Sequence, residues 1–322
     1  MKILVIGYGS IGQRHAKNLQ SLLKKEDFLA ICRQPGELEV EGIKTYFNLK
    51  TALKDKFDVA VIATPTNTHL PIALECAKAG LDLFVEKPLS NNSASINNLI
   101  KAVSKKTVMI GCNMRFEPGL NQAKQWIETK KIGKIICATG FVGQWLPDWR
   151  PTQDYSKNYS ASQKMGGGVI LDLIHELDYF YWMLGTPQRV ACIAGKRSNL
   201  KIQTEDVADI ILEFKNGAQG NIHLDYIKRA PARNCQIIGD QGTITWDFFS
   251  KKCLLEVVGK PLQEFCYSDF DRNDMYVNEM KHFLDCLKNK KKPLIDLAQG
   301  IDVLKIALAA KKSAQSSKII KI

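Results

Sequence analysis

The sequence predicts an α/β domain built on a parallel sheet, followed by an α+β domain with a largely antiparallel sheet. The first third alternates short, continuously apolar runs with helix-like patterns, as strands buried on both faces of a parallel sheet require. The second half has successive strand-like runs with no helix between them, which indicates antiparallel pairing. A chain of 322 residues is long enough for two domains, each with its own core.

We place the first domain at residues 1–118. Its expected strands are KILVIG, FLAIC, DVAVIAT, LDLFVEKP and TVMIGCN. The helical patterns between them cover residues 11–23, 49–54, 70–80 and 93–104. Ligands of such a sheet are expected at the carboxyl ends of its strands.

The second domain is expected at residues 119–322. In the run NIHLDY, apolar and polar residues alternate as in a half-buried strand, and the preceding Asn216-Gly217 pair predicts a hairpin turn. The last predicted helix is expected to pack back on the first domain. The predicted helices cover residues 119–129, 169–184, 273–288 and 297–316.

Composition favours a cytoplasmic protein with no membrane partner. Hydrophobic residues make up 45% and charged residues 24%, and no apolar stretch approaches the roughly 20 residues of a membrane span. The N-terminal apolar run is broken by glycines and has no small-residue cleavage site, so we expect no export signal. Nine cysteines are scattered without a C-x-x-C pair, which suits reduced thiols.

A glycine loop, Gly7-Tyr8-Gly9-Ser10-Ile11-Gly12, follows the first strand and opens the first helix. In a G-x-G-x-x-G loop the first glycine permits the turn, the second lets the backbone approach a pyrophosphate, and the third lets the helix close on the strand. The amides of Ser10 and Ile11 at the helix start would meet the phosphate charge. We therefore predict a Rossmann domain that binds a dinucleotide; a simple structural turn is the alternative.

The second strand ends in Cys32-Arg33-Gln34, where NAD-preferring sites usually carry an acidic residue. The Arg33 guanidinium could pair with a 2′-phosphate or lie over the adenine, which favours NADP slightly over NAD. Alternatively, Arg33 is a surface arginine and NAD is tolerated.

The net charge of +12 comes mostly from lysines spread along the chain. One cluster, Lys288 with Lys290, Lys291 and Lys292, ends at Pro293 and is expected to be a solvated loop. We therefore expect no nucleic-acid partner. The positive charge could attract an anionic substrate or the cofactor's phosphates, and genomic lysine bias explains it equally well.

Three further segments, together with the glycine loop, resemble the glucose-fructose oxidoreductase / inositol dehydrogenase (Gfo/Idh/MocA) family. They are ATPTNTH at 63–69, EKP at 86–88 and GGGVILDLIH at 166–175, and their order and spacing match along nearly the whole chain. The resemblance implies an NAD(P)-dependent oxidoreductase acting on sugars, cyclitols or nucleotide-linked sugars. It also implies an open-faced, mostly antiparallel sheet that often serves as an oligomer interface, hence a homodimer or homotetramer.

The resemblance also implies roles for individual residues. Thr64, Pro65, Asn67 and His69 would line the nicotinamide side, and Glu86 would also bind the cofactor. The ammonium of Lys87 would bond the reacting hydroxyl and hold the nicotinamide ribose; a solvated surface lysine is the alternative.

Asp172 and His175 stand three residues apart on the helix predicted at 169–184, so we expect them on one face. His175 could exchange a proton near neutral pH, and Asp172 could orient the substrate or the imidazole. A core histidine is the alternative. Asp178 could join them in a metal site, but no fourth ligand is evident, so we expect no metal.

One departure leaves the proton acceptor open. Commoner family versions place the histidine four residues after the aspartate, with a glycine between them, whereas here the gap is three and Ile174 precedes the histidine. Relatives in surface-polysaccharide or sialic-acid-like sugar gene contexts look similar, with HELDY at this point. Either Lys87 or His175 could therefore accept the proton.

Substrate contacts are expected from two regions. Arg115 lies in the segment NMRF, which resembles the family's hinge, and Tyr155 and Tyr159 lie in an aromatic loop that begins at Gln144. Aromatic rings and hydroxyls suit a sugar; a loop that packs its tryptophans beneath itself is the alternative. Two rival functions are a non-catalytic dinucleotide-binding sensor and a glycoside-cleaving relative that uses the dinucleotide transiently.

Overall fold

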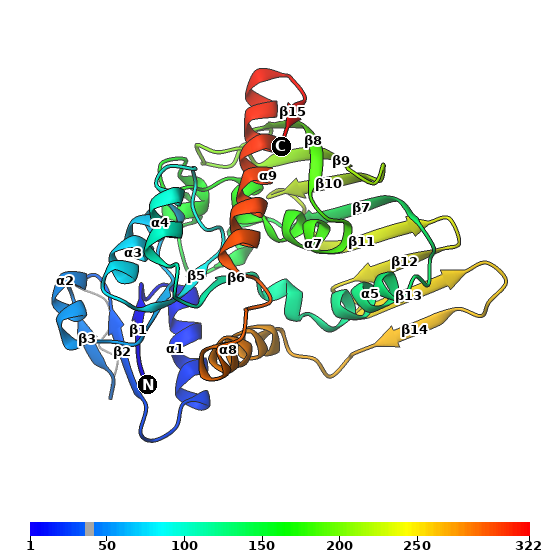
Figure 1. Cartoon of the computed structure of the whole chain (residues 1–322). Coiled ribbons are helices and arrows are strands. Elements are labelled where there is room, and N and C mark those ends of the chain that lie inside the picture. Colours follow the sequence, from blue (N-terminus) through cyan, green and yellow to red (C-terminus); the bar gives the residue numbers. More distant parts are fainter. Residues whose placement is uncertain (36–41) are drawn as a thin grey trace. The chain divides into compact units, whose positions relative to one another are not determined.

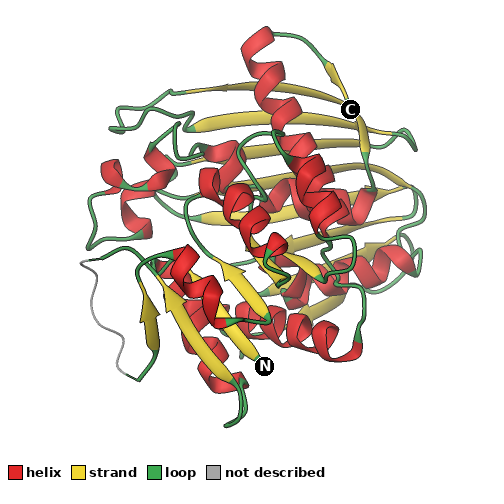
Figure 2. Ribbon diagram, turned by 60° about the vertical axis from the view of Figure 1, so that its left-hand side comes forward, coloured by secondary structure: helices red, strands yellow, loops and turns green. Residues whose placement is uncertain are grey.

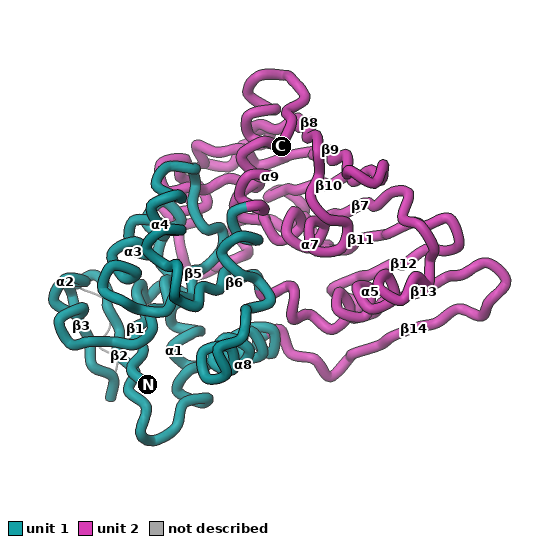
Figure 3. Tube along the Cα trace, in the orientation of Figure 1, with its two compact units in different colours: residues 1–112, 273–301 teal, residues 113–272, 302–322 magenta. Residues whose placement is uncertain are grey.

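The computed structural model describes residues 1–35 and 42–322 and groups them into two compact units (Figure 3). The first unit comprises residues 1–112 and 273–301, and the second comprises residues 113–272 and 302–322. Our sequence division placed everything after residue 118 in one domain, whereas the structure returns residues 273–301 to the first unit.

The first unit contains a six-stranded, all-parallel sheet in the order β3-β2-β1-β4-β5-β6 (Figure 1). The strand order reverses between β1 and β4, where the glycine loop follows β1. Every residue of β4 is buried, as expected for a strand covered on both faces. The strands are β1 (Lys2–Ile6), β2 (Phe28–Cys32), β3 (Lys44–Tyr46), β4 (Val59–Ile62), β5 (Asp82–Glu86) and β6 (Val108–Gly111). The short strand β3 was not predicted.

The helices of the first unit are α1 (Ser10–Leu22), α2 (Leu49–Ala52), the 3-10 turn η1 (Leu53–Asp55), α3 (Thr66–Lys78), α4 (Ile96–Ala102) and α8 (Arg272–Asn289). Helix α3 begins at Thr66 rather than residue 70, and Pro71 lies inside its first two turns.

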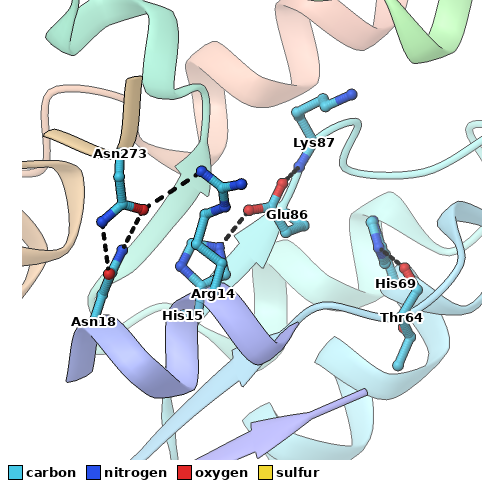
Figure 4. Close-up of polar contacts among 8 residues, drawn as sticks. All are labelled: Arg14, His15, Asn18, Thr64, His69, Glu86, Lys87 and Asn273. Atoms are coloured by element: carbon cyan, nitrogen blue, oxygen red, sulfur yellow. Dashed lines mark hydrogen bonds and ion pairs between the residues drawn. The ribbon is translucent and has the colours of Figure 1, made fainter. Parts of the chain in front are cut away.

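Helix α8 belongs to the first unit because its side chains pack there. Phe283 meets the Phe84 ring of β5 edge-on at 5.5 Å. The Nδ2 atom of Asn273 donates to Oδ1 of Asn18 on α1 at 3.0 Å (Figure 4). These contacts join residues more than 190 positions apart, which local sequence patterns do not reveal.

The second unit contains a nine-stranded sheet in the order β14-β13-β12-β11-β7-β10-β9-β8-β15 (Figure 1). Figure 2 shows its strands in yellow behind the helices that cover one face. Its strand pairs are antiparallel except for β7 with β10, so the predicted mostly antiparallel sheet is confirmed. Gly217, at a φ of +87°, lies in the turn that joins β9 to β10 and confirms the predicted hairpin. The strands are β7 (Ile135–Gly143), β8 (Pro187–Gly195), β9 (Val207–Phe214), β10 (Gln219–Asp225), β11 (Ala232–Gly239), β12 (Gly242–Asp247), β13 (Lys252–Val257), β14 (Gln263–Cys266) and β15 (Ile320–Lys321).

The helix predicted at 169–184 is two helices, which corrects our placement of Asp172 and His175. Helix α6 (Val169–Asp172) ends at the aspartate and α7 (His175–Leu184) begins at the histidine, so the two residues do not share one helical face. The break falls at Leu173 and Ile174, both buried, and no glycine or proline between residues 169 and 184 signalled it.

One face of the nine-stranded sheet is covered by helices and the other is open. The Phe180 ring of α7 fills the space over Gly140 and Gly220, where an added Cβ would lie 2.8 Å and 3.1 Å from it. On the opposite face Ile193 and Ile211 are exposed to 72% and 55%. The other helical elements are α5 (Pro118–Glu128), η2 (Asn113–Phe116), η3 (Leu146–Trp149), η4 (Tyr155–Lys157) and η5 (Tyr159–Ala161).

The last helix, α9 (Leu297–Ser316), begins among residues grouped with the first unit and continues in the second from Asp302. In the second unit Ser313 Oγ accepts the backbone N–H of Cys192 at 2.9 Å. Within residues 1–35 and 42–322, no helix combines the length and apolar character needed to cross a membrane.

Candidate functional site

The three glycines of the loop after β1 have different surroundings. Gly7 has a φ of +91°, and a Cβ there would lie 2.5 Å from the Ala63 carbonyl oxygen. A Cβ on Gly12 would lie 2.1 Å from the carbonyl oxygen of Gly7, so neither position accepts a side chain. A Cβ on Gly9 would meet nothing within 4 Å, which leaves the backbone open to a ligand at that glycine. The loop therefore fits a dinucleotide's pyrophosphate.

Gly9 is also the N-cap of α1 and, being a glycine, brings no side chain of its own to cap that helix end. Ser10, Ile11 and Gly12 form the first turn, whose backbone amides carry the positive end of the helix dipole. An anionic group at this end would be stabilised by the amides and the dipole together. The structure therefore places the predicted loop residues together at the start of α1.

Arg33 follows β2, as the sequence predicted, but its side chain is buried to all but 5%. Its guanidinium carbon lies 5.6 Å from the centre of the Phe47 ring. Arg33 is therefore held at the end of β2 by an aromatic neighbour, and its contact with a 2′-phosphate or an adenine stays a prediction.

His69 links two strand ends of the first unit. Its Nε2 lies 2.7 Å from the carbonyl oxygen of Thr64, after β4 (Figure 4), and its Nδ1 lies 2.8 Å from the carbonyl oxygen of Pro88, after β5. Burial lowers the pKa of His69. With both ring nitrogens directed at backbone oxygens, His69 supports the loops that carry Thr64 and Lys87.

Three other predicted residues surround the start of α3. Thr64 Oγ1 accepts a hydrogen bond from the Thr68 hydroxyl at 2.8 Å. Pro65 is the N-cap of α3, and Asn67 lies half-buried in its first turn. These residues follow β4, whose carboxyl end is an edge where parallel sheets bind ligands.

Glu86 connects α1 to the backbone of Lys87. His15 Nε2 lies 2.6 Å from Glu86 Oε1, and the backbone N–H of Lys87 donates to Oε2 at 3.2 Å. The Lys87 side chain is half-buried and extends away from Glu86 (Figure 4). Our sequence analysis missed His15; its position three residues after Gly12 was the only signal, since Glu86 lies 71 residues away.

Asp172, in the second unit, accepts three side-chain hydroxyls. Ser160 Oγ donates to Oδ2 at 2.6 Å, Tyr226 OH donates to Oδ2 at 3.0 Å, and Tyr159 OH donates to Oδ1. The carboxylate is 3% exposed, and burial raises the pKa of Tyr226 well above its usual value. Sequence reasoning found Asp172 and Tyr159 but missed Ser160 and Tyr226.

His175 and its neighbours begin α7. The imidazole is 8% exposed at the first position of the helix. The next residue, Glu176, forms a two-bond ion pair with Arg233, at 2.7 Å from Nε and 3.0 Å from NH2. This ion pair fixes the start of α7 on the sheet.

Arg115 and Asp178 form a fully buried ion pair. The guanidinium donates from Nε at 2.9 Å and from NH2 at 2.8 Å to the two carboxylate oxygens. This geometry joins η2 to α7 and gives both residues a structural role. Contact between Arg115 and a substrate stays a prediction.

The aromatic loop combines packing with polar contacts. Trp149 meets the Tyr226 ring edge-on at 5.3 Å, so this tryptophan packs inward. Tyr159 reaches Asp172, whereas the Tyr155 hydroxyl accepts the backbone N–H of Lys201 at 3.2 Å. Tyr159 and Tyr155 therefore have different surroundings.

The parallel sheet, its glycine loop and the second, mostly antiparallel sheet define a dinucleotide-binding protein of the oxidoreductase class. Residues 1–114 match the model of an oxidoreductase family with an NAD-binding Rossmann fold, and residues 120–245 match the GFO/IDH/MocA C-terminal domain. The chain belongs to the Gfo/Idh/MocA family.

Curated relatives match over almost the full length. The chain is 28% identical to myo-inositol 2-dehydrogenase from Thermotoga maritima, covering 100% of this chain and 98% of the relative. It is 25% identical to scyllo-inositol 2-dehydrogenase (NAD(+)) from Bacillus subtilis, covering 97% and 94%. Levoglucosan dehydrogenase in complex with NADH shares the fold, with a TM-score of 0.89 at 19% identity, covering 100% and 99%.

Proposed function

We propose that this protein is an NAD(P)-dependent dehydrogenase that transfers hydride between a nicotinamide cofactor and a hydroxyl-bearing or keto carbon. We place the substrate among sugars, cyclitols and nucleotide-linked sugars, in surface-polysaccharide or sialic-acid-like sugar metabolism. The observation that carries the proposal is the glycine loop, in which Gly7 and Gly12 have no room for a side chain and the space beside Gly9 is free of protein atoms within 4 Å. The two inositol dehydrogenases among the relatives support the substrate class.

The residues of the first unit would bind and orient the cofactor. The amides of Ser10, Ile11 and Gly12 would hold the pyrophosphate, and Thr64, Pro65 and Asn67 would orient the nicotinamide side. When bound, the nicotinamide supplies the hydride chemistry. His69 and Glu86 would fix the two loops that carry these groups.

The proton of the substrate hydroxyl would pass to Lys87 or His175. The Glu86 carboxylate accepts the backbone N–H of Lys87, which helps to fix the position of the Lys87 backbone. His175 is the alternative acceptor, because an imidazole side chain can exchange a proton close to neutral pH. Asp172, Tyr159 and the half-buried Tyr155 would orient the sugar hydroxyls.

We propose NADP as the slightly favoured cofactor, because Arg33 stands where NAD-preferring sites usually carry a carboxylate. The Bacillus subtilis relative is named for NAD(+), so both cofactors enter the assay. A tighter Kd for NADPH than for NADH, lost in Arg33→Ala, would support this preference.

We also propose a homodimer or homotetramer in the cytoplasm. The open sheet face with exposed Ile193 and Ile211 supports self-association, and nine free cysteines support a reducing compartment. Light scattering of the purified protein measures the assembly directly.

Incubation with candidate sugars and sugar nucleotides, with NAD and NADP in parallel, tests the activity through the absorbance of the reduced nicotinamide. In Lys87→Ala we expect turnover to be abolished and dinucleotide affinity to stay within about tenfold. Lys78→Ala, on the same unit at an exposed position of α3, is the matched control. Undiminished hydride transfer in Lys87→Ala refutes the lysine's role.

A further inference from the structure

A pocket of about 400 Å³ in the second unit is lined by three lysines, and the described residues of its lining include no carboxylate. Its walls are two segments of the chain, residues 156–165 and 196–203. Lys157 stands on the first segment, and Lys196 and Lys201 stand on the second. Ser162 and Gln203 add a hydroxyl and a side-chain amide to the lining.

Two hydrogen bonds connect the second wall to the first wall and to Tyr155, the residue just before it. The N–H of Gln203 donates to the Ala161 carbonyl oxygen at 2.8 Å, and the N–H of Lys201 donates to the Tyr155 hydroxyl at 3.2 Å. Ala161 and Ile202, both lining residues, are exposed to only 2% and 7%. The pocket therefore has a packed floor, with the lysines at its exposed positions.

The first wall is continuous in sequence with two of the residues that donate hydrogen bonds to Asp172; we call Asp172 and its donors Tyr159, Ser160 and Tyr226 the Asp172 cluster. Tyr159 and Ser160 donate hydroxyl hydrogen bonds to Asp172, and the next residues along the chain, Ala161 and Ser162, line the pocket. The Thr204 hydroxyl also donates to the Ser160 carbonyl oxygen at 3.1 Å, which ties the second wall to the same cluster. A group held in the pocket would lie close to the residues that fix Asp172.

Asp154, just outside the pocket's lining, offsets part of the charge of Lys157 and Lys201. Lys157 lies 3.9 Å from Asp154, and both side chains are well exposed, so their attraction is weak. Among the described residues, no carboxylate lies within 4.0 Å of the Lys196 or Lys201 ammonium. Three ammonium groups in one pocket attract an oxygen-rich anion and bond it with charge-assisted hydrogen bonds.

We propose that this pocket binds an anionic group of the substrate, a phosphate or a carboxylate, so that the sugar carries a negative charge away from its reacting carbon. This inference rests on the proposed dehydrogenase function and names the class of its substrate. The lysines supply affinity and selection for charged sugars, and hydride transfer does not require them.

Binding of inorganic pyrophosphate to the cofactor-saturated protein tests the pocket without turnover. In Lys196→Ala/Lys201→Ala we expect the Kd of pyrophosphate to rise at least about tenfold. Lys215→Ala/Lys260→Ala removes the same charge from exposed turns of the same unit and should bind as the wild type does. Equal affinity in the Lys196/Lys201 variant and this control overturns the proposal.

Kinetics with a sugar phosphate, a sugar acid and a neutral sugar identify the anion. We expect kcat/KM of the charged substrate to fall at least about tenfold in Lys196→Ala/Lys201→Ala, with the neutral sugar unchanged. An equal fall for charged and neutral sugars contradicts an anion site. Lysine-dependent pyrophosphate binding without hydride transfer from any sugar would keep the pocket and reject the proposed function.

Discussion

His15 Nε2 lies 2.6 Å from Glu86 Oε1, and both side chains are buried in the first unit. The other Glu86 oxygen accepts the backbone N–H of Lys87. One carboxylate therefore joins the helix that follows the glycine loop to the backbone of the lysine proposed to contact the substrate. Glu86 is a positioning residue in this arrangement.

Glu86→Gln keeps the shape of the side chain but replaces one acceptor oxygen with an NH2 donor. The single amide oxygen can keep the Lys87 N–H only if the NH2 group faces His15, and His15 Nε2 must then act as the acceptor. The link from α1 to the Lys87 backbone is therefore rearranged. We expect kcat to fall by about tenfold to a hundredfold, with dinucleotide affinity little changed. Steady-state kinetics and calorimetry measure both; Glu75→Gln, exposed on α3, is the control, and unchanged kcat in Glu86→Gln contradicts the positioning role.

Gly9→Ala and Gly12→Ala separate ligand contact from loop packing. The Gly9→Ala methyl meets no protein atom within 4 Å, so stability should hold while dinucleotide affinity falls at least about tenfold. In Gly12→Ala the methyl would lie 2.1 Å from the Gly7 carbonyl oxygen, so both stability and affinity should fall. If Gly9→Ala binds dinucleotide as tightly as the wild type, the ligand does not approach that glycine.

Asp172→Asn should weaken the second unit as well as catalysis. An amide cannot accept all three hydroxyls that Ser160, Tyr226 and Tyr159 direct at the carboxylate. We expect a loss of about 1–3 kcal/mol in the free energy of unfolding, measured in urea. Asp269→Asn, at an exposed position, should change stability little, and equal stability of both variants would refute the structural role of Asp172.

Glu117 makes stability depend on pH. The carboxyl is fully buried at the N-cap of α5, and burial raises its pKa from 4.5 to about 7. The folded state binds the Glu117 proton more tightly than the unfolded chain does. The contribution of this proton to the free energy of unfolding is therefore complete below about pH 4.5 and is lost as the pH rises through about 7. The loss amounts to about 3 kcal/mol.

Glu117→Gln should remove this dependence, since the amide stays neutral and its oxygen still accepts the Leu120 N–H. Urea unfolding between about pH 5 and 8 measures the slope of the unfolding free energy against pH. Identical slopes in the variant and the wild type would assign the pH dependence to other groups.

The sequence predicted the order of helices and strands well where burial is periodic. Strands such as β4 are apolar at every position because helices cover both faces of the sheet, and the Asn216-Gly217 turn follows from local backbone preference. The break between α6 and α7 was not predictable, because residues 169–184 contain no glycine or proline. The sequence pattern also did not show that α8 belongs to the first unit, because this depends on contacts between residues far apart in sequence, such as Phe283 and Phe84.

The candidate site was predictable only in part for the same reason. Motif spacing pointed to the glycine loop, Thr64, Lys87 and Asp172, which lie at the ends of strands or helices. The partners in their hydrogen-bond networks, His15, Ser160 and Tyr226, lie 12 to 71 positions from the carboxylates that they contact, and only His15 stands near a predicted motif. The buried pairing of Arg115 with Asp178 was likewise hidden, because neither residue is near the other in sequence.

Calorimetric titration of the purified protein with NADH and with NADPH tests the central claim, that the loop from Gly7 to Gly12 binds a dinucleotide. We predict one site per chain and a Kd in the micromolar range for at least one of the two, weakened in Gly9→Ala. No heat of binding from either nucleotide at millimolar concentration would contradict the account.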